Sequence, residues 1–155
     1  MEEENKVAMP ILGALVAALV GGALWATVTV MSEREWGLVA WAIGGLTGYA
    51  VGFLADRRAT QLHQIIAVVA SLIGIMLGKF FAFGYIVNNG MSGMFDSYVV
   101  SMFMELLPEM FSMFDILFVL FAVVTAWRLP AAMTAKAQQE QTPQPITPVN
   151  DRENL

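Results

Sequence analysis

A long apolar run between Ile65 and Val87 constrains the fold of this chain more than any other feature of the sequence (IIAVVASLIGIMLGKFFAFGYIV). An α-helix rises about 1.5 Å per residue, so roughly 20 residues cross the hydrocarbon core of a bilayer, which is about 30 Å thick. The run is therefore long enough to span a membrane as one helix. Lys79 is the only charged residue inside it.

Three further segments have the length and apolar content of membrane spans, so four transmembrane helices are predicted, over residues about 7–31, 36–55, 65–87 and 110–127. Pro10 is expected in the opening turn of the first span, where a missing amide hydrogen costs least. Aromatic residues near the span ends fit the aromatic belts of membrane proteins; they are Trp25, Trp36, Tyr85 and Trp127. The predicted fold class is an all-α integral membrane protein.

The composition excludes a water-soluble domain and several kinds of chemistry. Hydrophobic residues make up 57% of the chain and charged residues 14%, and the charged residues gather at the ends of the apolar segments. The eight basic residues form no patch and the formal net charge is -5, so we expect no nucleic-acid partner. Because cysteine is absent, the chain has no disulfide, no thiolate metal site and no cysteine nucleophile.

Basic residues predict the orientation in the membrane. Only Arg34 lies in a link on one side of the four-span topology, whereas five basic residues lie on the other side: Lys6, Arg57, Arg58, Arg128 and Lys136. Since basic residues are enriched in cytoplasmic loops, both termini of this multi-pass protein are predicted to be cytoplasmic. The first span follows three glutamates rather than a basic segment, so we expect it to be a true span and not a removable signal peptide.

The link between the third and fourth spans is too apolar for an ordinary loop. Ser97, Ser101 and Glu105 recur at intervals of four, which predicts an amphipathic extracytoplasmic interfacial helix over about 94–107, ended by Pro108. Glu105 lies near two further acids, Asp96 and Glu109. If copies of the chain assemble around an axis, these acids are expected to form an outer acidic entrance that favours cations.

Methionines in the same region allow a second interpretation. Thioethers are suitable ligands for Cu(I), so a metal site is the alternative function for Met91, Met94, Met102 and Met104. Methionine also fills irregular gaps, so all four can equally be packing residues. The only histidine, His63, is predicted on the cytoplasmic side as a helix-start residue, and it cannot complete a site with these methionines.

Small residues recur at helical spacing in three of the four spans. In lipid, small side chains allow helix backbones to approach closely, so these positions are predicted to pack helices together. They are Gly13, Ala17 and Gly21 in the first span, Gly44, Gly48 and Gly52 in the second, and Gly74 and Gly78 in the third. The packing can be within one chain or between copies, and we expect a homo-oligomer with closed symmetry.

Lys79 is predicted to pair with Asp115. Lys79 lies about 22 Å from the start of its span and Asp115 about 20 Å from Arg128 on the fourth span, from the rise per residue, so the two charges reach a similar depth. A charge inside a membrane is costly and usually has a partner. Two other interpretations stay open: Lys79 extends outward to the membrane surface, or the pair lines an ion path.

Three stretches resemble a widespread group of uncharacterised small bacterial multi-span inner-membrane proteins. They are Gly13 to Ala26, Glu35 to Gly52, and the Leu-Gly-Lys sequence that ends at Lys79. The resemblance covers the first three predicted helices. It implies a bacterial inner-membrane location and no particular activity.

The chain divides into an acidic N-terminus (1–6), a transmembrane domain (7–133) and a polar tail (134–155). The tail is rich in Gln, Thr and Pro and is predicted to be disordered, and its last residues, Glu153 to Leu155, resemble the start of an engineered protease-cleavage sequence. Ser71 and Thr47 lie within spans and are expected to bond their own helix backbone rather than to act in catalysis. No residue cluster suits an enzyme or a cofactor.

The predicted function is non-enzymatic. We expect a homo-oligomeric channel-like or scaffold assembly in the lipid bilayer. The alternatives are Cu(I) handling through the outer methionines, and an accessory subunit that recruits a soluble protein through its tail.

Overall fold

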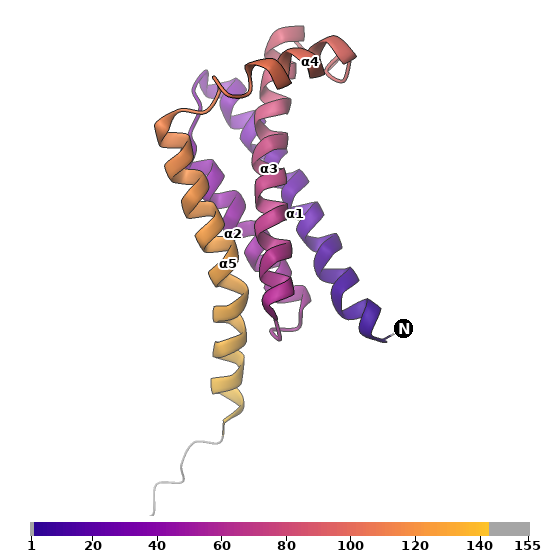
Figure 1. The fold of residues 1–155 in the computed structure, drawn as a ribbon, viewed down its shortest axis with the longest axis vertical. Helices are drawn as coiled ribbons and strands as arrows, with labels where there is room; N and C mark the ends of the chain where they lie inside the picture. Colours follow the sequence, from indigo (N-terminus) through magenta and orange to yellow (C-terminus); the bar gives the residue numbers. More distant parts are fainter. Residues whose placement is uncertain (1, 143–155) are drawn as a thin grey trace, which may run out of the picture.

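The computed structural model describes residues 2–142, and side chains from residue 6 onward. It contains five helices (Figure 1): α1 (Glu2–Ser32), α2 (Gly37–Leu54), α3 (Gln61–Asn88), α4 (Ser97–Leu106) and α5 (Met113–Gln141). There is no β-strand in this part of the chain. The predicted all-helical class is therefore confirmed.

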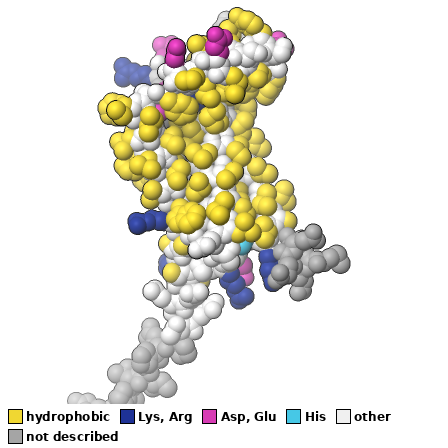
Figure 2. All heavy atoms as spheres, viewed as in Figure 1, with side chains coloured by type: hydrophobic (Ala, Val, Ile, Leu, Met, Phe, Trp, Pro, Cys, Tyr) yellow, Lys and Arg dark blue, Asp and Glu magenta, His cyan; other side chains and the backbone are white. Residues whose placement is uncertain are grey.

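Four of these helices, α1, α2, α3 and α5, are long and apolar enough to cross a membrane, and α4 is a shorter apolar helix. The four long helices alternate in direction along the bundle (Figure 1). The short helix α4 lies across one end of the bundle, the end away from the N-terminus. Figure 2 shows hydrophobic side chains over the visible side of the bundle and acidic side chains gathered at the end that carries α4. The prediction of four spans with a further helix between the third and fourth is confirmed.

The fourth long helix differs from its predicted bounds at both ends. It begins at Met113 rather than Met110, because Ser112 and Asp115 form a reciprocal capping box around its first turn. It continues past Trp127 to Gln141, so residues 134–141, predicted as disordered tail, are helical. Thr134 stabilises this extension by accepting a hydrogen bond at its Oγ1 from the amide of Ala59 (2.9 Å). The rest of the predicted tail, residues 143–155, lies outside the described residues.

Pro10 also lies elsewhere than predicted. Because α1 begins at Glu2, Pro10 is inside the helix and cannot donate to the carbonyl of Lys6. His63 lies in the first turn of α3, as predicted, and its Nε2 lies 3.2 Å from that carbonyl oxygen. The amide of Thr60 donates to His63 Nδ1 (3.1 Å), so Nδ1 is the acceptor and Nε2 carries the hydrogen. A side chain of α3 thus replaces the bond that the proline removes.

A second proline, Pro130, lies inside α5 and is fully buried. It too lacks an amide hydrogen for the preceding turn. Close to it, the side chain of Gln64 donates from Nε2 to the carbonyl oxygen of Trp127 (3.1 Å). Neighbouring polar side chains at the start of α3, His63 and Gln64, therefore bond backbone oxygens near the interior prolines of two other helices.

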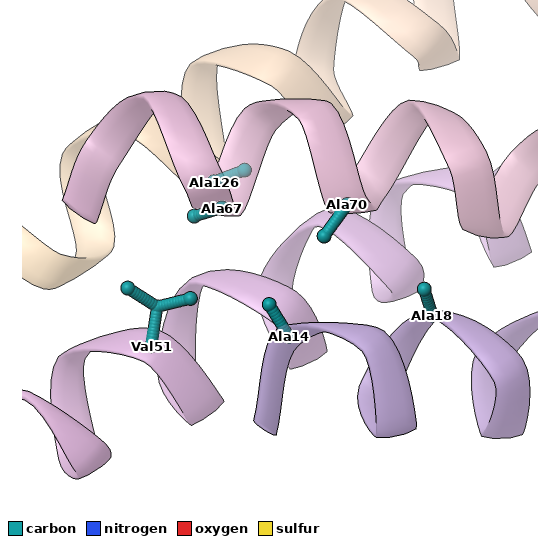
Figure 3. Packing of buried hydrophobic residues seen from close by; sticks show 6 residues of the cluster. All are labelled: Ala14, Ala18, Val51, Ala67, Ala70 and Ala126. Carbon is teal, nitrogen blue, oxygen red and sulfur yellow. The ribbon is translucent and has the colours of Figure 1, made fainter. Parts of the chain in front are cut away.

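The core is built from small side chains. One cluster draws on all four long helices (Figure 3): Ala14, Ala18, Val51, Ala67, Ala70 and Ala126. A second cluster contains Trp25, Ile43 and Ile75 and lies nearer the end that carries α4. Such small residues let helix backbones approach one another in the absence of a hydrophobic driving force between spans.

Helical glycines make the closest helix contacts. A methyl group at Gly44 would collide with the backbone of Ala122 on α5, and one at Gly74 would lie 3.1 Å from the backbone of Ala18 on α1. All eight predicted packing residues face another helix or are buried within this one chain: Gly13, Ala17, Gly21, Gly44, Gly48, Gly52, Gly74 and Gly78. Of these eight residues, the glycines of α2 thus face α5, those of α3 face α1, and Gly13 and Gly21 of α1 face α2.

Candidate functional site

The candidate site is centred on Lys79, whose side chain is completely buried. Its Nζ donates to Glu35 Oε2 (2.7 Å) and to the carbonyl oxygen of Met110 (2.9 Å). Asp115 Oδ2 lies 3.6 Å from the same nitrogen. The structure therefore brings together the two residues that sequence reasoning paired, and adds a closer carboxylate. We call Lys79, Glu35 and Asp115 the Lys79 cluster.

Glu35 is not among the predicted partners of Lys79, because the prediction compares only the depths of charges inside the spans. It lies in the link between α1 and α2, and its side chain is 35% exposed. The order of the predicted helices nevertheless indicates that Glu35 lies near Lys79. This link, the end of α3 and the start of α5 all occur at the same end of an up-down bundle, so an acid in the link could have been predicted to lie near Lys79.

Asp115 has two roles in the cluster. The amide and the hydroxyl of Ser112 each donate to Asp115 Oδ2 (2.9 Å for both), while the amide of Asp115 donates to Ser112 Oγ (3.2 Å). The carboxylate therefore caps α5 and faces the ammonium of Lys79 with the same oxygen. Its place in the first turn is electrostatically favourable, because a helix N-terminus carries partial positive charge.

Aromatic rings cover the remaining sides of the ammonium. Lys79 Nζ lies 5.0 Å from the ring centre of Phe111 and 5.7 Å from that of Trp25, both within the range of a cation–π interaction. Trp25 is buried, and its Nε1 has no hydrogen-bond partner in the structure. Lys79 of α3 is thus contacted by side chains or backbone from four other segments: α1, the α1–α2 link, the α4–α5 connection and α5.

The Lys79 cluster reaches the surface through Glu35. A pocket of about 630 Å³ lies on one side of this carboxylate and is lined in part by Asp115 and Glu109. A second pocket of about 500 Å³ lies on the other side, and Arg34 lines both. Lys79 itself has no exposed surface, so it does not reach solvent as the alternative interpretation required. The geometry is that of an ion-paired clamp at the end of the bundle, with water access on the carboxylate side.

The three predicted entrance acids are exposed but separate. Asp96 is the N-cap of α4, Glu105 lies in its last turn and Glu109 follows it in the connection to α5. Within the part of the chain that the structure describes, no group of three or more acidic, histidine or cysteine residues could hold a metal ion. One chain therefore does not close the acidic ring, which would need several copies.

The four methionines fall in two places. Met91 and Met94 line an apolar groove beside Phe81 and Phe95, and Met94 is buried against Gly84. Met102 and Met104 belong to α4. Met94 is thus a packing side chain, whereas Met91 and Met104 are 78% and 61% exposed.

The polar residues inside the spans behave differently from one another. Thr47 bonds its own helix, as predicted, by donating to the carbonyl oxygen of Ile43 (3.0 Å). Ser71 is buried on α3 and its hydroxyl has no partner in the structure, so the same prediction is wrong for Ser71.

The fold and the site together define a class: a helical membrane protein with four candidate spans and an ion-paired lysine at one end of its bundle. No family model matches the sequence, and neither a curated protein nor a solved structure matches the chain. The resemblance of the first three helices to bacterial inner-membrane proteins therefore stays an expectation.

Proposed function

We propose that this chain is a non-enzymatic scaffold protein of the bacterial inner membrane, whose copies assemble side by side through α2. Both termini are cytoplasmic in this proposal. The basic residues support that orientation, because Lys6, the pair Arg57 and Arg58, and Lys136 belong to segments at the end of the bundle opposite α4. The end that carries α4 then faces outward.

Gly45 is the observation that carries the proposed assembly. A methyl group at Gly45 would meet nothing within 4 Å, whereas one at every other helical glycine in the described residues would contact another part of the chain. Glycine is a poor helix former, by about 1 kcal/mol relative to alanine, so its presence in an open helical position lacks an explanation within one chain. A close helix–helix contact with another copy supplies one.

The surroundings of Gly45 suit such a contact. Ala42 on the same face is small and exposed, and Trp41 and Tyr49 on either side are about half exposed (47% and 54%). Small residues flanked by aromatic rings give a surface on which a second α2 can lie closely. A two-fold arrangement would bring the two copies of Gly45 next to each other.

A scaffold is favoured over a channel because the interior of the protomer is filled. Alanine and glycine bring α1 onto α3 and α2 onto α5 at backbone contact. A conducting path would therefore have to run between copies, with the acids of the α4 end at its mouth. Cation flux in liposomes that depends on Glu105 would favour that channel form of the assembly.

The substitution Gly45→Leu tests the proposed assembly. The open space around Gly45 lets the protomer accept the side chain, so the helical fold is expected to persist while the assembly dissociates. The measurement is native mass spectrometry from mild detergent, with Ala8→Leu, at an exposed position on α1, as the matched control. A Gly45→Leu variant with the same oligomer mass as the wild type would contradict the proposal.

A further inference from the structure

An apolar groove of about 450 Å³ lies on the side of the bundle, between α1, the end of α3 and the α3–α4 connection. Ala23 and Ala26 of α1 leave room for it, and Phe81, Met94 and Phe95 line it. Its volume is within the usual range for small-molecule sites, about 300–1,000 Å³. The groove is thus a defined apolar recess in the lateral surface of a membrane-spanning bundle.

The apolar groove adjoins the second pocket beside Glu35, which we call the polar pocket. The two share Val30 and Tyr85 in their linings, and the polar pocket has a volume of about 500 Å³. Tyr85 has an apolar ring and a polar hydroxyl, which suits the boundary between hydrocarbon and headgroups. The combined site is apolar along the side of the bundle and polar at the end of the bundle. This distribution matches an amphiphile, which has an apolar chain and a polar headgroup.

A buried hydroxyl in the polar pocket has no partner. Thr29 lines the pocket with only 6% of its surface exposed, and its Oγ1 makes no hydrogen bond in the structure. Buried polar groups almost always have a hydrogen-bond partner, because an unpaired one has lost its hydrogen bonds to water without replacement. Because this oxygen has no accessible surface, a ligand oxygen in the polar pocket would become its partner after the Thr29 side chain rotates toward the pocket.

The charges of the polar pocket are of both signs. Arg34 and Glu33 line it, and neither makes an ion pair with another described residue. Glu35 also lines it but is already engaged by Lys79. A headgroup that carries one negative and one positive charge would complement this arrangement, whereas a purely anionic headgroup would leave Glu33 opposed.

We infer that the apolar groove and the polar pocket together hold one phospholipid with a zwitterionic amine headgroup. An acyl chain occupies the apolar groove, the phosphate lies against Arg34 and Thr29, and the ammonium group lies against Glu33. The site lies where α1 ends and its link begins, which is the depth expected of headgroups. This inference does not depend on the proposed assembly, because every residue of the site belongs to one chain.

The test is lipid retention, measured by native mass spectrometry after delipidation and titration with phosphatidylethanolamine or phosphatidylglycerol. We expect the wild type to retain the zwitterionic lipid roughly tenfold more strongly, the effect of one good charge-assisted hydrogen bond. Glu33→Gln is expected to abolish that preference, because Glu33 faces the ammonium group that only the zwitterionic lipid carries. Arg34→Gln and Thr29→Val should lower the retention of both lipids, because both lipids carry the phosphate. Ala23→Leu, at an exposed position, should fill the groove and lower the retention of both lipids.

Arg58→Gln is the matched control, because Arg58 lies in the α2–α3 link at the opposite end of the bundle. It is expected to retain lipid as the wild type does. The inference would be overturned if the wild type retained the two lipids equally and if Arg34→Gln and Ala23→Leu left that retention unchanged. Such a result would show that the retained lipid is only surrounding bilayer lipid. Circular dichroism that shows native helix content in each variant excludes misfolding as the cause of a loss.

Discussion

Lys79 is held at the residue scale by groups that are distant in the sequence. Its ammonium joins Glu35 of the α1–α2 link, the carbonyl of Met110 and the capping carboxylate of Asp115. A buried charge is costly unless it is paired and hydrogen-bonded, so these contacts are a condition for Lys79 to lie inside the bundle at all. The cluster ties the α1–α2 link and the α4–α5 connection to α3.

Asp115→Asn tests that pairing. The amide keeps the shape of the side chain and can still accept from Ser112, so the main loss is the charge opposite Lys79. We expect a decrease of roughly 2 kcal/mol in the free energy of unfolding, less than the 3–5 kcal/mol typical of a broken buried pair, because Glu35 remains. Unfolding by SDS in mixed micelles measures it.

The exposed acid Asp96 provides the matched control for this substitution. Asp96→Asn is expected to change the unfolding free energy by less than about 0.5 kcal/mol, since its side chain makes no capping hydrogen bond. If Asp115→Asn were as stable as Asp96→Asn, the pairing would carry no stability and the clamp would be refuted.

The sequence predicted part of this cluster and not the rest. Counting residues from the span ends gave Lys79 and Asp115 a similar depth, because the helix rise is fixed. Glu35 could not be found in that way. It lies outside any helix, and its approach to Lys79 depends on the path of the link and on how the helices pack.

At the element scale, adjacent glycines of α2 face different surroundings. Gly44 abuts the backbone of Ala122, and Gly45 is open. The α2–α5 contact therefore depends on the absence of a side chain at Gly44 and does not depend on its absence at Gly45.

The paired substitutions Gly44→Ala and Gly45→Ala test this asymmetry. We expect Gly44→Ala to lower the unfolding free energy by about 1–3 kcal/mol, as overpacking does, because backbone atoms cannot move aside. Gly45→Ala should be neutral or raise it by up to about 1 kcal/mol, because alanine is the better helix former. Unfolding of the monomeric fraction in SDS micelles compares them directly. Equal effects at the two sites would contradict the described packing.

The existence of the long helices was predictable and some of their ends were not. Runs of apolar residues fix where a chain can span a membrane, so four spans followed from the sequence. The interior position of Pro10 and the extension of α5 past Trp127 depend on tertiary partners, namely His63 beside Lys6 and Thr134 beside Ala59. Local propensity carries no information about such partners.

At the scale of the whole molecule, one end of the bundle carries most of the unusual chemistry. The Lys79 cluster, the polar pocket and α4 lie there, and the open face at Gly45 lies on the side of α2. We assign this end of the bundle to lipid recognition and the α2 face to assembly.

Disulfide cross-linking of the single-cysteine variant Gly45→Cys in native membranes tests whether two copies meet at α2. The chain has no cysteine, so each introduced thiol reports one position. A two-fold contact at α2 would place two such residues within the roughly 4.4–6.8 Å between Cα atoms that a disulfide allows. We expect a reducible band at twice the protomer mass for Gly45→Cys and none for Ala8→Cys. A Gly45→Cys protein that reacts with a maleimide but stays monomeric under oxidation would contradict it.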